Sequence, residues 1–184
     1  MTGYLVLCAR VMIGAVLLIS VAGKTHGRLA FGEFLNWLRD LTVIPQRLTT
    51  AVAVTMVAAE AAAVALLAFP MTLALGLAWA AATFAIFAAS IAWIAHLGVS
   101  VPCRCFGTSA RLLGLSQIVR DIALALVAAW AAVSAYLEPQ PVPPAPGVAA
   151  ALLLGAAAAV LVIRLDDVVE LFVPLTRHIS PLPK

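Results

Sequence analysis

Two cysteines separated by one residue are the clearest candidates for chemistry in this sequence. Cys103 and Cys105 lie in the short stretch VPCRCFGTS, and the chain has only three cysteines. A disulfide between them would close a very small ring, and departure from relaxed disulfide geometry stores strain. Strained, exposed disulfides are easily reduced and tend to be catalytic or regulatory. Arg104, between the thiols, favours the reactive thiolate through its positive charge. The pattern predicts a thiol–disulfide exchange site, and the alternative is a loop with two unpaired cysteines.

Two charged residues lie in or at the end of apolar segments, where charge is unfavourable. Glu60 falls near the middle of the apolar run 48–69, and a charged group at the bilayer centre costs about 2.5–3.5 kcal/mol on insertion scales. We expect it to face a bundle interior, either as a proton relay or cation partner, or as a hydrogen-bonded packing residue. Lys24 ends the first apolar run. Its ammonium could activate a cysteine or hold a substrate carboxylate, or it could simply extend to the lipid headgroups.

Further polar residues are expected on the same side of the membrane as the cysteine loop. Counting spans places Lys24, His96 and Arg120 there, so Arg104, Arg120 and His96 are candidates for binding a substrate or partner. His96 and the two cysteines are also soft ligands that suit zinc or copper. Their spacing matches no common zinc motif, and we predict no metal site. Cys8 is expected near the opposite face, as a small packing residue.

The elements that position these residues are transmembrane helices. Hydrophobic residues make up 65% of the 184-residue chain and charged residues 10%, whereas soluble domains carry about 25% charged residues. The formal charge of +3 is small, no nucleic-acid motif is visible, and we exclude nucleic acid as a partner. The prediction is an all-α, polytopic membrane helix bundle with four core helices and a fifth. The expected spans are about 4–23, 48–69, a run from Pro70 to about 97, 117–137 after an N-cap at Ser116, and the shorter run 147–163.

The segments between and after these spans are predicted to form a short interfacial helix, an extended linker and a polar tail. Residues Leu29, Phe34, Leu35, Leu38 and Leu41 recur at helical spacing and predict a short helix in the membrane interface, with Trp37 at headgroup level. The stretch 138–147 holds five prolines and predicts an extended linker. The expected organisation is a four-helix domain over 1–137, this linker, and a fifth helix with an interfacial polar tail over 148–184.

Taken together, these residues resemble the MauE branch of the MauE/DoxX family of redox-associated membrane proteins. The resemblance covers about residues 5–137. Its specific element is Cys-x-Cys-Phe-Gly at 103–107, and Lys24, Glu60 and Arg120 match as single positions. The resemblance implies a multi-pass protein of the bacterial plasma membrane that acts in thiol–disulfide redox and maturation of exported proteins, as in methylamine dehydrogenase maturation.

The same resemblance implies partners and roles for the site residues. Cys103 and Cys105 carry over as the redox pair, with Glu60 and Lys24 assisting proton movement or ligand binding. The partners would be the lipid bilayer, a thioredoxin-like redox protein and an exported, disulfide-bearing client. A membrane quinone is a hypothetical electron acceptor, for which no motif is visible. The alternatives are a metal-binding or transport protein and a non-catalytic assembly subunit of a membrane complex.

The side of the membrane that holds the cysteines is predicted differently by charge and by chemistry. With five spans, ten of the eleven basic residues share the side of the cysteine loop. The positive-inside rule makes that side cytoplasmic. An oxidative role would instead place the cysteines outside the cytoplasm, where disulfides persist.

Overall fold

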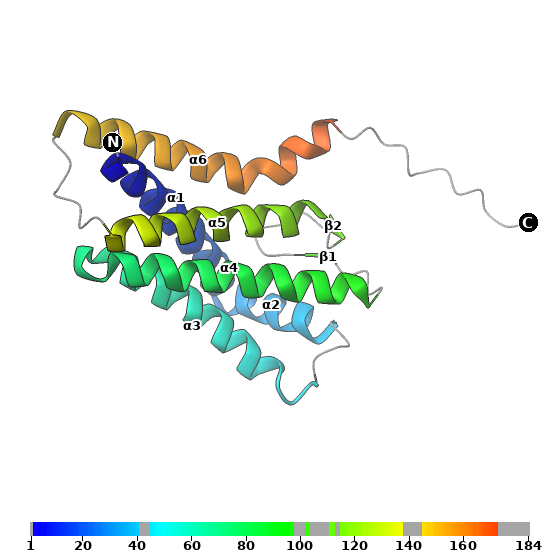
Figure 1. Ribbon diagram of the computed structural model, residues 1–184. Helices are drawn as coiled ribbons and strands as arrows, with labels where there is room; N and C mark the ends of the chain where they lie inside the picture. Colours follow the sequence, from blue (N-terminus) through cyan, green and yellow to red (C-terminus); the bar gives the residue numbers. More distant parts are fainter. Residues whose placement is uncertain are drawn as a thin grey trace, which may run out of the picture.

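The computed structural model is a bundle of long helices (Figure 1). It describes residues 2–40, 45–97, 102–103, 111–112 and 115–172. Five of the described helices are long and apolar enough to cross a membrane, so the predicted all-α polytopic bundle is confirmed. These are α1 (Thr2–Thr25), α3 (Thr49–Ala68), α4 (Leu73–His96), α5 (Leu115–Leu137) and α6 (Ala145–Phe172). Shorter elements are α2 (Arg28–Asp40), the 3-10 turn η1 (Pro70–Thr72) and the strands β1 (Pro102–Cys103) and β2 (Arg111–Leu112).

The core is formed by inward stripes of α1, α3, α4 and α5. On α1 the buried residues recur every three or four positions, as on any helix with one buried face. Ile13 and Leu17 are at most 1% exposed and pack with Leu77, Phe84 and Leu124. Many large apolar side chains on the outer faces are exposed. This pattern suits a bundle whose solvent is lipid.

The turn between α3 and α4 is short, and side-chain donors bind the carbonyl groups at the C-terminus of α3. Pro70 opens η1, and the Thr72 hydroxyl donates to the Leu66 carbonyl at 2.6 Å. The Arg10 guanidinium of α1 donates to the carbonyls of Leu67 and Ala68, each at 2.8 Å. Carbonyls at a helix C-terminus lack partners within the helix and favour a cation. Arg10 therefore fixes the antiparallel hairpin against the first half of α1.

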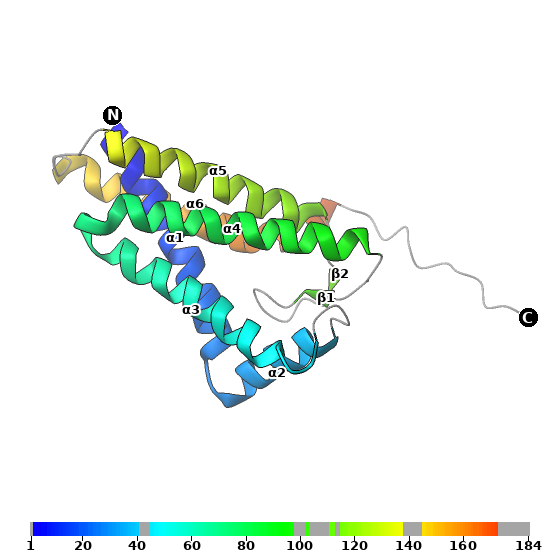
Figure 2. The same ribbon diagram turned by 60° about the horizontal axis from the view of Figure 1, so that its bottom comes forward.

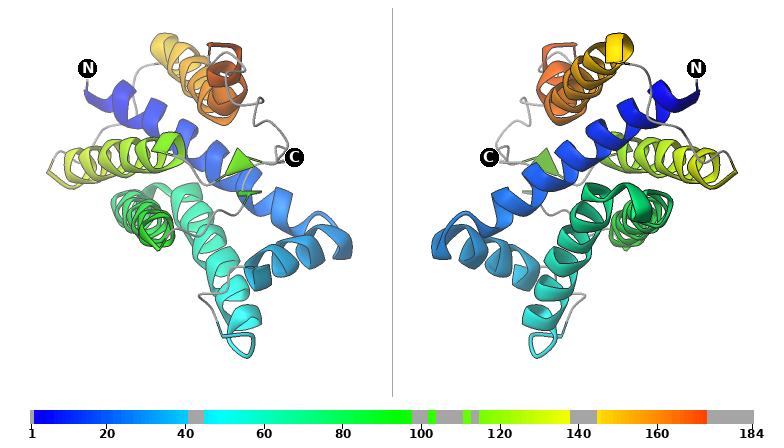
Figure 3. Two further views of the ribbon diagram at one scale, coloured as in Figure 1. Left: turned by 90° about the vertical axis from the view of Figure 1, so that its right-hand side faces the viewer. Right: turned by 90° about the vertical axis from the view of Figure 1, so that its left-hand side faces the viewer.

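Helix α6 packs along α1 through a row of small residues (Figure 3). Gly147, Ala151, Gly155 and Ala159 recur every fourth residue, and Ala151 and Ala159 are buried. A Cβ at Gly155 would lie 2.7 Å from the Cys8 carbonyl oxygen. Small residues allow such close approach of membrane helices. Cys8 is half-buried in this contact, as expected for a packing residue.

Several predicted boundaries differ from the structure. Helix α6 begins at Ala145, inside the predicted linker, and continues past the predicted end of the fifth span to Phe172. Pro146 is compatible with this start because a first-turn proline lacks only an N–H that would have no partner there. Helix α5 begins at Leu115, so Ser116 belongs to its first turn and is not the residue before it. Residues 138–144 and 173–184 lie outside the described residues.

The predicted short helix is present as α2 and packs against α1 and α3; its location in the membrane interface stays a prediction. Phe34 and Leu38 are buried beside Ala53 of α3, and Trp37 stacks on Phe34 with ring centroids 6.1 Å apart. Leu29, which the sequence places on the apolar face, is 85% exposed. It lies in the first turn of α2, beyond the packed residues. Leu41 lies outside the described residues.

One end of the bundle gathers the elements around the cysteine segment (Figure 2). Helix α4 ends there and α5 begins there, and the two strands lie between them in the chain. Strand β1 pairs antiparallel with β2, with Cys103 opposite Arg111. We call this end the cysteine end. Helix α1 crosses the bundle obliquely, and its last turns lead into α2, away from the first turns of α5.

Candidate functional site: a buried ion pair inside the bundle

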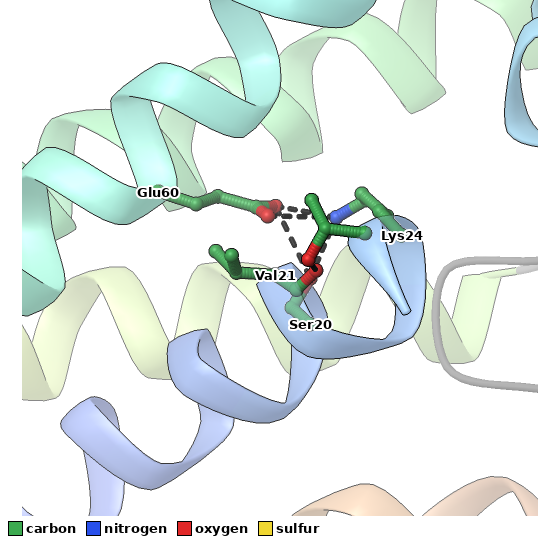
Figure 4. Close-up of polar contacts among 5 residues, drawn as sticks. Ser20, Val21, Lys24 and Glu60 are labelled. Carbon is green, nitrogen blue, oxygen red and sulfur yellow. Dashed lines mark hydrogen bonds and ion pairs between the residues drawn. The ribbon is translucent and has the colours of Figure 1, made fainter. Parts of the chain in front are cut away.

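An ion pair between α1 and α3 is buried inside the bundle. The Lys24 ammonium lies 2.6 Å from Glu60 Oε1 and 2.8 Å from Oε2. The exposed fractions of the two residues are 4% and 1%. Figure 4 shows both side chains pointing toward each other from facing helices. The interior position expected for Glu60 is therefore observed, and its partner is a cation. Extension of Lys24 to the headgroups, one of the two alternatives from the sequence, is wrong.

Ser20 completes this cluster and was not predicted from the sequence. Lys24 Nζ donates to Ser20 Oγ at 2.6 Å, and Ser20 Oγ donates to Glu60 Oε1 at 3.2 Å. An ammonium has three N–H donors, and the two Glu60 oxygens and the Ser20 hydroxyl account for all three. The one available signal was the spacing, because Ser20 precedes Lys24 by one helical turn on the same face. A ligand that needed a donor from Lys24 would have to displace one of these contacts.

Helix α2 also contacts the pair, through Phe34. The Lys24 ammonium lies 5.7 Å from the centroid of the Phe34 ring, within the range of a cation–π contact. Phe34 is itself fixed by Leu38, Ala53 and the stacked Trp37. The ammonium is therefore enclosed by a carboxylate, a hydroxyl and an aromatic face.

The inward face of α5 carries a second polar group, at the cysteine end. Gln117, Arg120 and Asp121 are 5–7% exposed and continue the stripe that begins with the buried Leu124. Arg120 Nε donates to Asp121 Oδ1 at 3.2 Å. Gln117 Oε1 is buried and accepts no hydrogen bond within the described part of the chain. The bundle core is thus apolar in its middle and polar toward the cysteine end.

The structure describes only some of the remaining predicted site residues. Cys103 lies in β1, whereas Arg104 and Cys105 lie outside the described residues. His96 is the last residue of α4 and is exposed. Within the described ranges, histidines, cysteines and carboxylates do not gather in groups of three that could hold a metal ion. Among the predicted site residues, the structure brings Lys24 together with Glu60, and it pairs Arg120 with Asp121.

The fold and the buried ion pairs define a multi-pass membrane protein with a polar, cysteine-bearing end. The family model of methylamine utilisation protein MauE matches residues 2–134. The chain belongs to the MauE family. The match covers α1 to α4, the cysteine loop and most of α5, and it ends before α6. No curated protein and no solved structure matches the chain.

Proposed function

We propose that this protein acts in thiol–disulfide redox during the maturation of exported proteins. Cys103 and Cys105 form the exchange pair, a thioredoxin-like protein is the redox partner, and a disulfide-bearing exported protein is the client. The bacterial plasma membrane is the proposed location. The observation that carries the proposal is family membership over a region that includes both the Cys-x-Cys-Phe-Gly loop and the buried ion pair.

The proposed exchange follows ordinary thiol–disulfide chemistry. The thiolate of one cysteine attacks a partner disulfide, a mixed disulfide forms, and a partner thiolate leaves with the electron pair. The second cysteine then attacks the mixed disulfide, which leaves Cys103 and Cys105 joined and the partner reduced. The two protons lost by the cysteines are taken up by the two partner thiolates. This exchange therefore balances, because two electrons and two protons pass from the cysteine pair to the partner disulfide.

The buried pair supports a role in proton movement more than one in direct ligand binding. Lys24 has no donor left over after its contacts with Ser20 and Glu60. A carboxylate held inside a membrane bundle is a functional candidate, and proton transfer is a common use. His96, exposed at the end of α4, is available to a partner on the surface. Arg120 is buried against Asp121, so we assign it to the support of this end, and its contact with a partner stays a prediction.

The first test is trapping of the mixed disulfide. A Cys105→Ser variant in a Cys8→Ala background keeps one attacking thiol and lacks the residue that would release the partner. After acid quenching and alkylation, we expect a reducible adduct on non-reducing gels, identified by mass spectrometry. The Cys8→Ala protein with both loop cysteines is the matched control and should accumulate less adduct. Full maturation activity in the Cys103→Ala/Cys105→Ala variant would contradict the proposal.

A second test concerns the side of the membrane. Intact cells are treated with a membrane-impermeant maleimide, with and without prior reduction, in the Cys8→Ala background. Labelling of Cys103 and Cys105 only after reduction would support an extracytoplasmic disulfide and the role in exported proteins. Free thiols that label only after the membrane is opened would place the pair in the cytosol and contradict that role.

A further inference from the structure

The Lys24–Glu60 pair is closed off from water in the structure. The two residues are 4% and 1% exposed, and their charged groups bind each other and Ser20. A buried charge can exchange a proton with the surroundings only when water or another proton carrier reaches it. Such an exchange therefore needs a movement of one of the elements that enclose the pair.

Among the elements that enclose the pair, α2 is attached separately from the main core. Phe34 and Leu38 of α2 are buried in a small apolar cluster with Ala53 of α3. The described residues of the main core come from the other long helices and include none from α2. Elements with few buried apolar contacts open at a lower free energy than the core does. Helix α2 can therefore move while the main core stays packed.

The corner between α1 and α2 has the properties of a hinge. Gly27 lies there with a φ of +94°, a conformation that favours glycine. A Cβ at this position would have no neighbour within 4 Å in the described part of the chain, so space does not restrict the corner. Hinges are formed by a few residues at the ends of elements, which absorb changes in φ and ψ. Figure 2 shows α2 leading from the end of α1 to the first turns of α3.

The contact that α2 makes with the ion pair is an aromatic face. The Phe34 ring lies with its centroid 5.7 Å from the Lys24 ammonium, and the residue is 5% exposed. Exposed polar residues occupy the outer side of α2: Glu33, Asn36, Arg39 and Asp40. A rotation of α2 away from α3 would replace the aromatic face with water and leave the two charges bonded to each other.

We infer that α2 is a lid over the Lys24–Glu60 pair, hinged at Gly27 and sealed by Phe34, and that its opening admits water to the two charges. The lid is a conformational device built into the fold. It goes beyond the cysteine chemistry and does not rest on it, because the residues involved belong to α1, α2, α3 and the corner at Gly27.

The test measures how fast Lys24 reacts with an amine reagent in the folded protein. The chain has two lysines, Lys24 and Lys184. The purified protein in detergent is treated with trinitrobenzenesulfonate, and mass spectrometry of its peptides gives the labelling rate of Lys24 relative to Lys184. Labelling through a local opening depends on the stability of the lid, whereas labelling through global unfolding depends on the stability of the whole bundle.

The first pair of variants removes one buried phenyl ring from each cluster. Phe34→Ala weakens the seal, and we expect the labelling rate of Lys24 to rise at least about tenfold. Phe84→Ala is the matched control, because Phe84 is 3% exposed and belongs to the main core. It should lower the midpoint of thermal unfolding and leave the labelling rate unchanged within about twofold. Equal rises in both variants would overturn the lid, since Lys24 would then be reached only by unfolding of the bundle.

The second pair of variants tests the hinge and leaves every side chain of the seal in place. Gly27→Ala adds a Cβ at a positive φ, and the strain of the closed corner should raise the labelling rate about five- to thirtyfold. Gly23→Ala is the control, because its Cβ also meets open space but its φ is not positive. This pair tests the lid even where Phe34→Ala does not fold. An unchanged labelling rate in Gly27→Ala would overturn the inference.

Discussion

The Lys24–Glu60 pair allows a quantitative prediction about how much the two charges together contribute to the free energy of unfolding. Glu60→Gln keeps the side-chain shape but leaves the Lys24 ammonium buried at 4% exposure without its counter-ion. Removing one partner of a buried pair destabilises by about 3–5 kcal/mol, since the remaining charge is uncompensated. Lys24→Met leaves the Glu60 carboxylate in the same position, and we expect a loss of similar size. The double variant has no unpaired charge and should therefore lose less than either single variant.

The assay is a double-mutant cycle on the free energy of unfolding in mixed micelles of a mild detergent and dodecyl sulfate. Because the double loss should be smaller than either single loss, we expect a coupling energy of at least about 3 kcal/mol between these directly contacting residues. Asp40→Asn at the exposed end of α2 is the matched control and should change stability by less than about 0.5 kcal/mol. Additive losses, within about 0.5 kcal/mol, would refute the ion pair as the interaction that joins α1 and α3.

Three further predictions concern the packing that holds the site in place. Gly155→Ala forces a Cβ to 2.7 Å from the Cys8 carbonyl oxygen. We therefore expect about 1–3 kcal/mol of destabilisation and faster alkylation of Cys8. The control is Gly14→Ala, which has open space at its Cβ and should not destabilise the protein. Arg10→Gln removes the guanidinium that donates to the last carbonyls of α3 and should cost about 1–3 kcal/mol in the same unfolding assay, whereas an unchanged midpoint would show that the cap is dispensable. Trp79→Phe removes the indole N–H that donates to the Ala59 carbonyl at 3.1 Å and should cost about 1 kcal/mol, with no loss expected for the exposed Trp93→Phe.

The fold was largely predictable because lipid imposes strong constraints on sequence. Apolar runs of membrane length locate the helices, and Pro70 marks the hairpin. The ends of helices were less predictable, since a proline such as Pro146 is compatible with a first turn as well as with a linker. Leu29 was misplaced because helical periodicity gives a face but does not show where packing on that face stops.

The site was predictable in part, through the unfavourable energy of buried charge. Glu60 was expected to be interior because a carboxylate in a membrane span needs a partner. The partner could not be identified from the sequence, since Lys24 at a helix end can equally reach the headgroups. Ser20 and Gln117 were missed because uncharged polar residues are common in membrane helices and their importance depends on contacts between helices.

The central claim is that Cys103 and Cys105 form an exchangeable redox pair, and its most direct test is a reduction potential. The Cys8→Ala protein is equilibrated in thiol–disulfide buffers of graded potential, acid-quenched and alkylated, and the mass shift gives the oxidised fraction. We predict reversible oxidation with a midpoint between about −270 and −120 mV, the range of proteins that exchange disulfides. Cysteines that stay reduced at every potential, or a disulfide that persists below about −300 mV as structural ones do, would contradict the account.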